Sequence, residues 1–68
     1  VDAIAVYDLP AARQTASALV ESEKRGRPMS LADAQIAGIC LAGGYTLATR
    51  DVSDFSTTTG LTIINPFA

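Results

Sequence analysis

Residues 30–49, SLADAQIAGICLAGGYTLAT, decide the fold class because they set a buried helix directly before a strand. Ser30 is followed three residues later by Asp33, which is the spacing of a capping box, with aspartate in place of the usual Glu or Gln. The segment 31–42 is apolar on almost every side. We therefore predict a helix that begins after Ser30 and buries most of its surface.

Glycines and two further apolar runs continue this unit toward the C-terminal side. Gly43 and Gly44 are expected to end the helix, since glycine readily takes the left-handed conformation found at helix C-termini. We predict a strand over residues 45–49, YTLAT. We predict a chain reversal that includes a single turn of helix over residues 50–55, RDVSDF. After a polar loop, residues 61–67, LTIINPF, predict another strand.

A second helix is predicted upstream, after a first strand. Residues 3–7, AIAVY, have the β-branched and aromatic content of a strand buried on both faces. Asp8 is the predicted N-cap of a helix over 9–25, with Pro10 in the first turn and Gly26 as the C-terminal cap. Four apolar residues at helical spacing mark the face expected to pack inward. They are Ala12, Ala16, Leu19 and Val20.

The predicted order of elements is therefore β-α-α-β-β, with short loops. Pro28 keeps the two helices apart, because proline breaks a helix interior. Strands separated by helices favour an α/β sandwich with a mainly parallel sheet. The 68 residues fit a single domain, and a chain of this length buries only about 60% of its unfolded surface. Such a domain is marginally stable without a disulfide, a metal or a partner chain.

Composition narrows the classes of protein and site. A net charge of −2 gives no basic footprint for general nucleic-acid binding, and we interpret Lys24, Arg25 and Arg27 as a solvated helix end. The absence of histidine removes most zinc sites and the commonest general base. Cys40, inside the apolar helix, is interpreted as a small buried hydrophobe. No apolar run reaches the roughly 18 residues of a membrane span, so we expect a cytoplasmic protein with no membrane partner.

Three acidic residues, Asp33, Asp51 and Asp54, allow two interpretations. In the first they serve local structure, as a helix N-terminal acid and as turn formers. In the second they converge, because Asp51 follows a strand and helix N-termini share the carboxyl edge of an α/β sheet. Clustered carboxylates repel one another unless a cation binds. Oxygen ligands without histidine favour Mg²⁺ or Mn²⁺, and such an ion activates water and stabilises charge on a phosphoryl group.

A family resemblance bears on these alternatives. The stretch PMSLADAQIAGICLAGGYTLATRDVSDF, with the closing GLTIINPF, resembles the C-terminal half of PIN-domain ribonucleases, and most of all bacterial toxins of the VapC and FitB kind. The residues that carry it are SLADAQIA around Asp33, LATRDVSDF around Asp51 and Asp54, and the preceding GRP at 26–28. The likeness covers nearly the whole chain, and the motifs agree with the family in order and spacing.

The resemblance implies both a fold and a chemistry. Such proteins are three-layer α/β/α sandwiches with a mainly parallel sheet, and their carboxylate cluster holds Mg²⁺ or Mn²⁺ and hydrolyses RNA phosphodiester bonds. It implies that Asp33, Asp51 and Asp54 are metal ligands and catalytic residues. It also implies a toxin whose partners are its RNA substrate and a cognate antitoxin.

The sequence departs from that family in one respect. Full-length members begin with a strand that bears a further aspartate and carry a glutamate on an early helix, and this sequence matches neither region. We therefore expect residues 1–68 to be a partial PIN-like domain, a fragment of the enzyme with little activity alone. The alternative is a non-catalytic module that associates through an exposed sheet edge and an apolar helix. Both interpretations predict a homodimer or higher oligomer.

Overall fold

The computed structural model of the protein describes residues 8–66, which form two long helices, a two-stranded sheet and a short 3₁₀ helix. In chain order the elements are α1 (Leu9–Lys24), α2 (Leu31–Gly43), β1 (Leu47–Ala48), η1 (Val52–Phe55) and β2 (Ile63–Ile64). This order matches the predicted sequence of elements from the first helix onward. The predicted first strand, residues 3–7, lies outside the described residues.

Local hydrogen bonds set both ends of α1. The Asp8 carboxylate accepts a hydrogen bond from the Ala11 N–H at 3.1 Å, which makes Asp8 the N-cap. Gly26 has a positive φ of 73°, and the following Arg27 N–H donates to the Ser22 carbonyl at 3.0 Å. This is the long hydrogen bond of a Schellman motif, in which the left-handed residue is usually glycine. The predicted caps of this helix are confirmed.

The Ser30 N-cap and the glycine end of α2 were also predicted correctly from the sequence. The Ser30 hydroxyl oxygen accepts a hydrogen bond from the Asp33 N–H at 3.1 Å. At the other end Gly44 takes a left-handed φ of 69°, and the next amide, that of Tyr45, donates to the Cys40 carbonyl at 2.8 Å. The helix therefore ends at Gly43, one residue beyond the predicted span 31–42.

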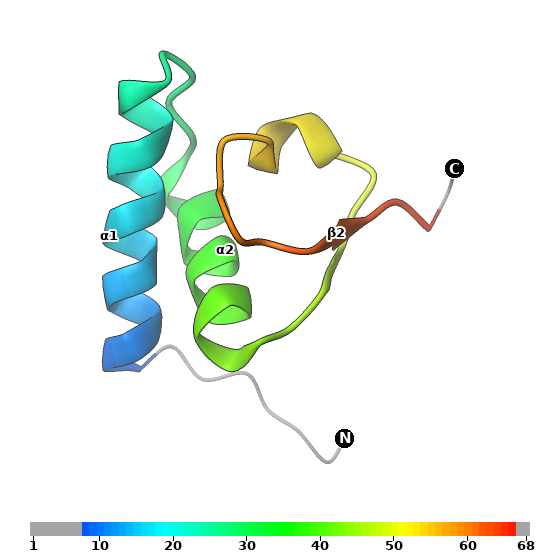
Figure 1. Cartoon of the computed structure of the whole chain (residues 1–68), viewed down its shortest axis with the longest axis horizontal. Helices are drawn as coiled ribbons and strands as arrows, with labels where there is room; N and C mark the ends of the chain where they lie inside the picture. Colours follow the sequence, from blue (N-terminus) through cyan, green and yellow to red (C-terminus); the bar gives the residue numbers. More distant parts are fainter. Residues whose placement is uncertain (1–7, 67–68) are drawn as a thin grey trace.

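The two long helices lie side by side and meet through small residues (Figure 1). The buried residues of α1 are Ala11, Thr15, Ala18 and Ser22, and those of α2 are Ala34, Ala37 and Gly38. Gly38 marks the closest approach: a Cβ atom there would lie 2.6 Å from the Ala11 carbonyl oxygen and 2.8 Å from the Thr15 nitrogen. Glycine has no Cβ atom, and the backbone of α1 occupies the space that a side chain at this position would need.

The predicted inward face of α1 was wrong. The face expected to be buried was Ala12, Ala16, Leu19 and Val20, yet Val20 is 51% exposed. The buried stripe contains Thr15 and Ser22, whose hydroxyls donate to the carbonyls of Ala11 at 2.9 Å and Leu19 at 2.8 Å. Because each hydroxyl is satisfied by its own helix, its burial leaves no unpaired donor. The buried face of α1 is therefore set by the small size of its residues, which permits close approach of the helices, and not by their hydrophobicity.

The two strands pair in parallel, as predicted. The register pairs Leu47 with Ile63 and Ala48 with Ile64. Each strand is two residues long, shorter than the predicted segments 45–49 and 61–67. The flanking bonds run from the Leu47 N–H to the Thr62 carbonyl at 2.9 Å and from the Thr49 N–H to the Ile64 carbonyl at 3.0 Å. Within residues 8–66, only the centre of each predicted segment has a ladder partner.

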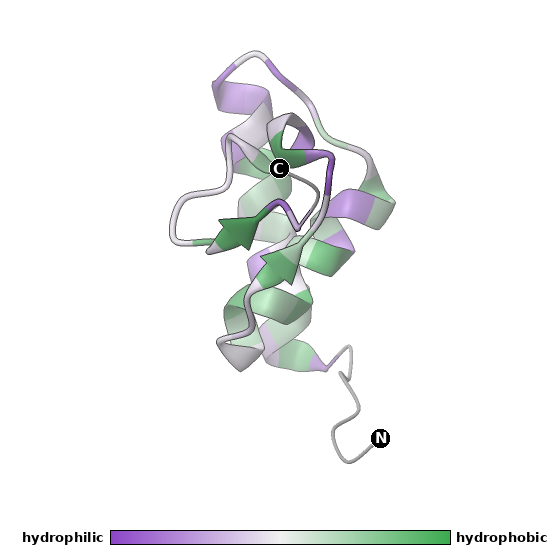
Figure 2. Ribbon diagram, turned by 90° about the vertical axis from the view of Figure 1, so that its right-hand side faces the viewer, coloured by the Kyte–Doolittle hydropathy of each residue, from purple (hydrophilic) through white to green (hydrophobic). Residues whose placement is uncertain are grey.

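Both long helices lie on one side of the sheet, as Figures 1 and 2 show from two directions. The core between them contains buried Ala18, Ala37 and Phe55, against which Met29, Leu47, Leu61 and Ile63 pack. The second helical layer expected of a three-layer sandwich is not found among residues 8–66. Cys40, expected to be buried, is half-buried.

Among residues 8–66, no helix combines the length and the apolar character needed to cross a membrane.

Candidate functional site

A polar pocket of about 180 Å³ lies where the connection between the helices, the first turn of α2 and the η1 region meet. Its lining residues are Arg27, Pro28, Met29, Ser30, Asp33, Ser53, Asp54 and Thr57. Two of the three aspartates predicted as site residues are therefore brought together, from segments about twenty positions apart in the sequence.

The capped start of α2 positions Asp33. The Ser30 hydroxyl that accepts from the Asp33 N–H fixes the first turn of the helix, and both residues line the pocket. The Asp33 side chain is half-buried. Asp33 lies in the first turn of α2, where a negative charge interacts favourably with the partial positive charge of the helix N-terminus. Asp33 thus has a local structural role in addition to its place in the pocket.

Asp54 reaches the same pocket from η1. Its backbone N–H donates to the Asp51 carbonyl at 3.1 Å, which closes the single 3₁₀ turn. The next residue, Phe55, is only 4% exposed and packs in the core with Ala18 and Ala37. The buried ring anchors η1 to the helices, and it leaves the exposed Asp54 carboxylate at the pocket.

Asp51 is placed differently. It is the residue before η1, and within the described residues its side chain makes no capping hydrogen bond to this turn. Its N–H donates to the Thr49 hydroxyl oxygen at 3.1 Å, and it is not among the pocket lining residues. Within residues 8–66, no three acidic or thiol side chains are grouped closely enough to hold a metal ion together. The predicted convergence of all three aspartates is thus not seen in the described part of the chain.

Two lining residues were missed by reasoning from the sequence. Arg27 was assigned to a solvated helix end, but the Schellman turn after α1 carries it to the pocket. Thr57 is 6% exposed, and its hydroxyl has no hydrogen-bond partner among the residues that the structure describes. A buried hydroxyl without a partner costs about 1–3 kcal/mol, so it is a group to which a ligand or water would bind favourably. Nothing in the polar run STTTG distinguishes this threonine from its neighbours.

The oxygen donors of the pocket fit a hard divalent cation in part. Asp33 and Asp54 offer carboxylates from two elements, and serine and threonine residues complete the polar lining. Mg²⁺ is commonly held in this way, by one or two carboxylates with water in the remaining positions. Mn²⁺ prefers the same oxygen ligands. The pocket therefore fits a weakly held ion with an incomplete protein shell.

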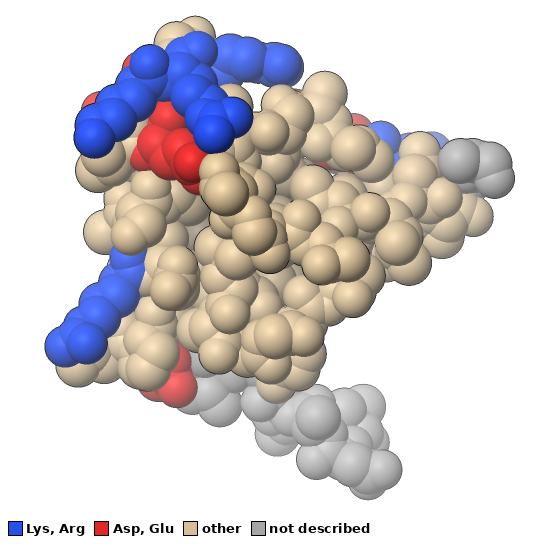
Figure 3. All heavy atoms as spheres, viewed as in Figure 1, with Lys and Arg blue, Asp and Glu red and all other residues tan. Residues whose placement is uncertain are grey.

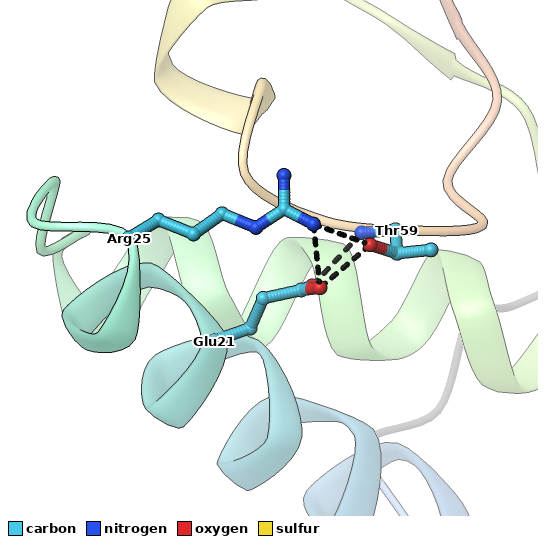
Figure 4. Close-up of polar contacts among 3 residues, drawn as sticks. All are labelled: Glu21, Arg25 and Thr59. Carbon is cyan, nitrogen blue, oxygen red and sulfur yellow. Dashed lines mark hydrogen bonds and ion pairs between the residues drawn. The ribbon is translucent and has the colours of Figure 1, made fainter.

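A second polar cluster joins α1 to the loop before β2 (Figure 4). The Glu21 carboxylate accepts hydrogen bonds from the Thr59 hydroxyl at 2.6 Å and from the Thr59 N–H at 2.9 Å. Arg25 pairs with the same carboxylate at 3.3 Å and donates to the Thr59 hydroxyl at 3.2 Å. The hydroxyl bond above all, then the amide bond and the nearby Arg25, lower the pKa of Glu21 from its ordinary value of 4.5.

This second cluster borders a larger surface depression of about 590 Å³. Its lining residues are Ala16, Ser17, Val20, Glu21, Lys24 and Arg25, all on or next to α1. None of the three aspartates lines it. The larger depression contains one carboxylate, that of Glu21, which is bound to Thr59 and Arg25. We place the candidate site at the smaller polar pocket because two of the three predicted aspartates line it.

Comparison with known proteins gives the chain two relatives. No family model matches it. It is 41% identical over 61 residues to the plasmid stability protein StbB of Pseudomonas syringae pv. tomato, and 39% identical over 61 residues to the VapC ribonuclease Y4jK of Sinorhizobium fredii. Each match covers 90% of this chain and 43% of the relative, so the chain spans less than half of either protein. Over nearly all its length, the chain is thus similar to part of a VapC ribonuclease and of a plasmid stability protein.

Proposed function

We propose that this chain is part of a Mg²⁺- or Mn²⁺-dependent endoribonuclease, the toxin of a toxin–antitoxin pair. The observation that carries the proposal is the pocket shared by Asp33 and Asp54. Similarity to a protein named as a VapC ribonuclease supports RNA as the substrate. Similarity to a plasmid stability protein agrees with a toxin that acts with a cognate antitoxin.

In this proposal the residues of the chain hold and orient the reacting groups. Asp33, fixed by the capped start of α2, and Asp54, fixed through Phe55, present carboxylate oxygens from two anchored elements. A bound divalent cation would supply water activation and would neutralise charge on the phosphodiester. Asp51 stays in the proposal as the third acid, at the start of the turn that carries Asp54.

Two carboxylates in one pocket make an incomplete coordination shell. Phosphodiester hydrolysis needs reacting groups held in a fixed geometry, and Mg²⁺ binds weakly where few protein ligands are offered. The family resemblance assigns a further aspartate and glutamate to a region that this sequence does not match. We therefore expect the 68 residues alone to bind Mn²⁺ weakly and to cleave RNA slowly or not at all.

The test is complementation in trans. The part of the Sinorhizobium fredii relative that lies outside the matched region is added to the chain, and cleavage of a labelled single-stranded RNA is followed with and without Mn²⁺. We expect metal-dependent cleavage that Asp33→Asn abolishes. Asp8→Asn is the matched control, because it removes the same charge at a helix N-cap outside the pocket and asparagine still caps. Equal cleavage by both variants would contradict the role of Asp33.

A second candidate function, self-association without catalysis, is favoured by exposed apolar surface. Large hydrophobic side chains stay exposed on α2 and around the sheet: Leu31 at 59%, Ile36 at 43%, Tyr45 at 44%, Val52 at 39% and Ile64 at 52%. Each strand has one ladder partner within residues 8–66, so its other edge is open to pairing in the described part of the chain. Apolar patches and open edges of this kind favour association.

Sedimentation equilibrium at micromolar concentration tests this candidate. We expect a mass above that of one chain, and we expect Ile36→Lys on α2 to shift it toward the monomer. Leu9→Lys is the control, since it introduces the same charge at another exposed apolar position, at the start of α1. A monomeric wild type would rule out the association.

A further inference from the structure

A group of cationic residues lies next to the polar pocket and has no role in the function proposed above. This basic cluster consists of Lys24, Arg25 and Arg27, at the end of α1 and in the turn that follows. Figure 3 shows lysine and arginine side chains gathered over this end of the molecule, at the top of the view. Arg27 belongs both to the basic cluster and to the lining of the pocket, so the two surfaces are continuous.

The members of the basic cluster differ in what they already bind. Arg25 is engaged with the Glu21 carboxylate and with the Thr59 hydroxyl. Within residues 8–66, the side chains of Lys24 and Arg27 form no ion pair and no hydrogen bond. Arg25 therefore holds a loop to its helix, whereas Lys24 and Arg27 keep their donors available for an external anion.

The pocket combines opposite charges, and this restricts the ligand that suits it. Asp33 and Asp54 attract a cation, while the Arg27 guanidinium attracts an anion and repels a free metal ion. A divalent cation bound to a phosphate satisfies both, because the cation meets the carboxylates and a phosphate oxygen meets the guanidinium. Arginine suits that contact, since its planar fork of donors matches phosphate oxygens. The unpartnered Thr57 hydroxyl offers one more donor in the same lining.

We propose that Arg27 is the phosphate-binding residue of the pocket, and that Lys24 continues the contact along the RNA backbone outside it. This rests on the proposed ribonuclease function and extends it, by naming the residues that hold the strand. Arg27 then positions the phosphodiester beside the acids. The basic cluster sets the direction in which the strand leaves the pocket.

Binding of a 2′-O-methyl single-stranded RNA, which resists cleavage, tests the proposal by fluorescence anisotropy in Mn²⁺ over a range of salt concentrations. We expect Arg27→Gln to weaken binding roughly tenfold, the loss expected for a charge-assisted hydrogen bond. It should also lower the slope of log affinity against log salt by about 0.7, the value for one phosphate contact on a single strand. Lys24→Gln should lower the slope similarly, with a smaller loss of affinity. Arg13→Gln is the matched control, an equal charge change at an exposed position of α1 outside both depressions.

Mn²⁺ binding measured by electron paramagnetic resonance provides a readout that does not depend on cleavage. For the wild-type chain we expect the RNA to strengthen Mn²⁺ binding, because ion and phosphate bind as a pair. Arg27→Gln should bind Mn²⁺ alone at least as tightly as the wild type, because the repelling guanidinium is gone, and should lose this enhancement. Arg27→Lys should restore only part of it, since lysine replaces the charge but not the fork.

The outcomes separate this inference from the proposed function. If Arg27→Gln binds RNA like Arg13→Gln while Asp33→Asn abolishes Mn²⁺-dependent binding, the role given to Arg27 is wrong and the metal-dependent function stands. If the wild-type chain binds no RNA in Mn²⁺, the phosphate-binding inference is overturned, and complementation in trans decides the function separately. Circular dichroism of each variant confirms that its helices are intact.

Discussion

The α1–α2 interface and the polar pocket share one helix but are built in different ways. Along the interface the backbones nearly touch, and Ala11, Ala34 and Ala37 are fully buried. At the pocket, two exposed or half-buried aspartates come from a helix start and a single 3₁₀ turn. The interface tolerates almost no added atom, whereas the pocket is open to solvent and to a ligand.

This difference separates what sets the fold from what sets the site. Asp33 is carried by α2, so its position is as rigid as the interface that holds this helix. Asp54 depends on η1, whose buried residue is Phe55 alone. A substitution at the interface should therefore unfold the domain, while a substitution around the pocket should change the site with a smaller loss of stability.

The largest effect is expected from Gly38→Ala. The added methyl group would overlap the Thr15 hydroxyl and the backbone atoms of Ala11 and Thr15. Backbone cannot move aside as a flexible side chain can, so the helices must separate, at a cost of about 3 kcal/mol. Thermal unfolding followed by circular dichroism measures the loss.

Two further variants sharpen this test. Thr15→Ala combined with Gly38→Ala should not restore stability, because the Ala11 carbonyl oxygen and the Thr15 nitrogen still block the methyl group. Ala32→Leu adds more volume to the same helix at an exposed position and should be nearly neutral. A melting temperature of Gly38→Ala equal to that of the wild type would refute the close packing of α1 on α2.

The features that could be predicted from the sequence are those held by contacts between near neighbours. The N-caps at Asp8 and Ser30 each involve a hydrogen bond between residues three positions apart in the sequence. The glycine ends of both helices follow from the preference of glycine for the left-handed conformation. A mainly parallel sheet was predicted because helices separate strands in the expected order, and β1 and β2 do pair in parallel. Within the described residues, such local and topological rules were sufficient to define the helices and their ends.

The remaining features depend on contacts that the sequence pattern does not encode. Thr15 and Ser22 are buried in place of Val20 because α2 approaches closely, and a hydrophobicity pattern ranks these residues in the opposite order. Similarly, the sequence predicted that Asp51 and Asp54 would lie in the same site. In the structure they lie at the start and in the middle of one 3₁₀ turn, and of the two only Asp54 lines the pocket. Thr57 became a pocket residue through the tertiary fold, with no local signal.

An intermediate effect is expected at the junction of the two regions, from Ser30→Ala. This change removes the hydroxyl that caps α2 and leaves the Asp33 N–H without its partner. The loss should be about 1 kcal/mol, typical of an N-cap serine, and a melting curve or urea titration measures it. Ser30→Thr should recover most of the loss, because threonine also caps. Ser17→Ala, at an exposed position of α1, is the control and should change stability little. If both serine-to-alanine variants behave alike, the cap does not hold the start of α2.

The smallest effect concerns the cluster that ties the loop before β2 to α1. The Thr59 hydroxyl first, then the Thr59 amide and Arg25, favour the ionised Glu21 carboxylate and lower its pKa in the folded chain. A carboxyl whose pKa is lowered on folding stabilises the fold above its unfolded pKa, near 4.5, and that contribution is lost as pH falls through the lower folded value. The stability difference between wild type and Glu21→Gln should thus be present at pH 7 and shrink below about pH 4.5.

Hydrogen exchange tests this last prediction at a single backbone amide, that of Thr59. The Thr59 amide donates directly to Glu21, so its protection should fall in Glu21→Gln at neutral pH and in the wild type on acidification. Glu23→Gln makes the same charge change two residues away without a bond to Thr59, and should leave this amide unchanged. The amides within α2, held by the small-residue interface, should keep their protection in every variant and over the same pH range. A pH-independent difference between wild type and Glu21→Gln would mean that the loop is held by its packing and not by the carboxylate.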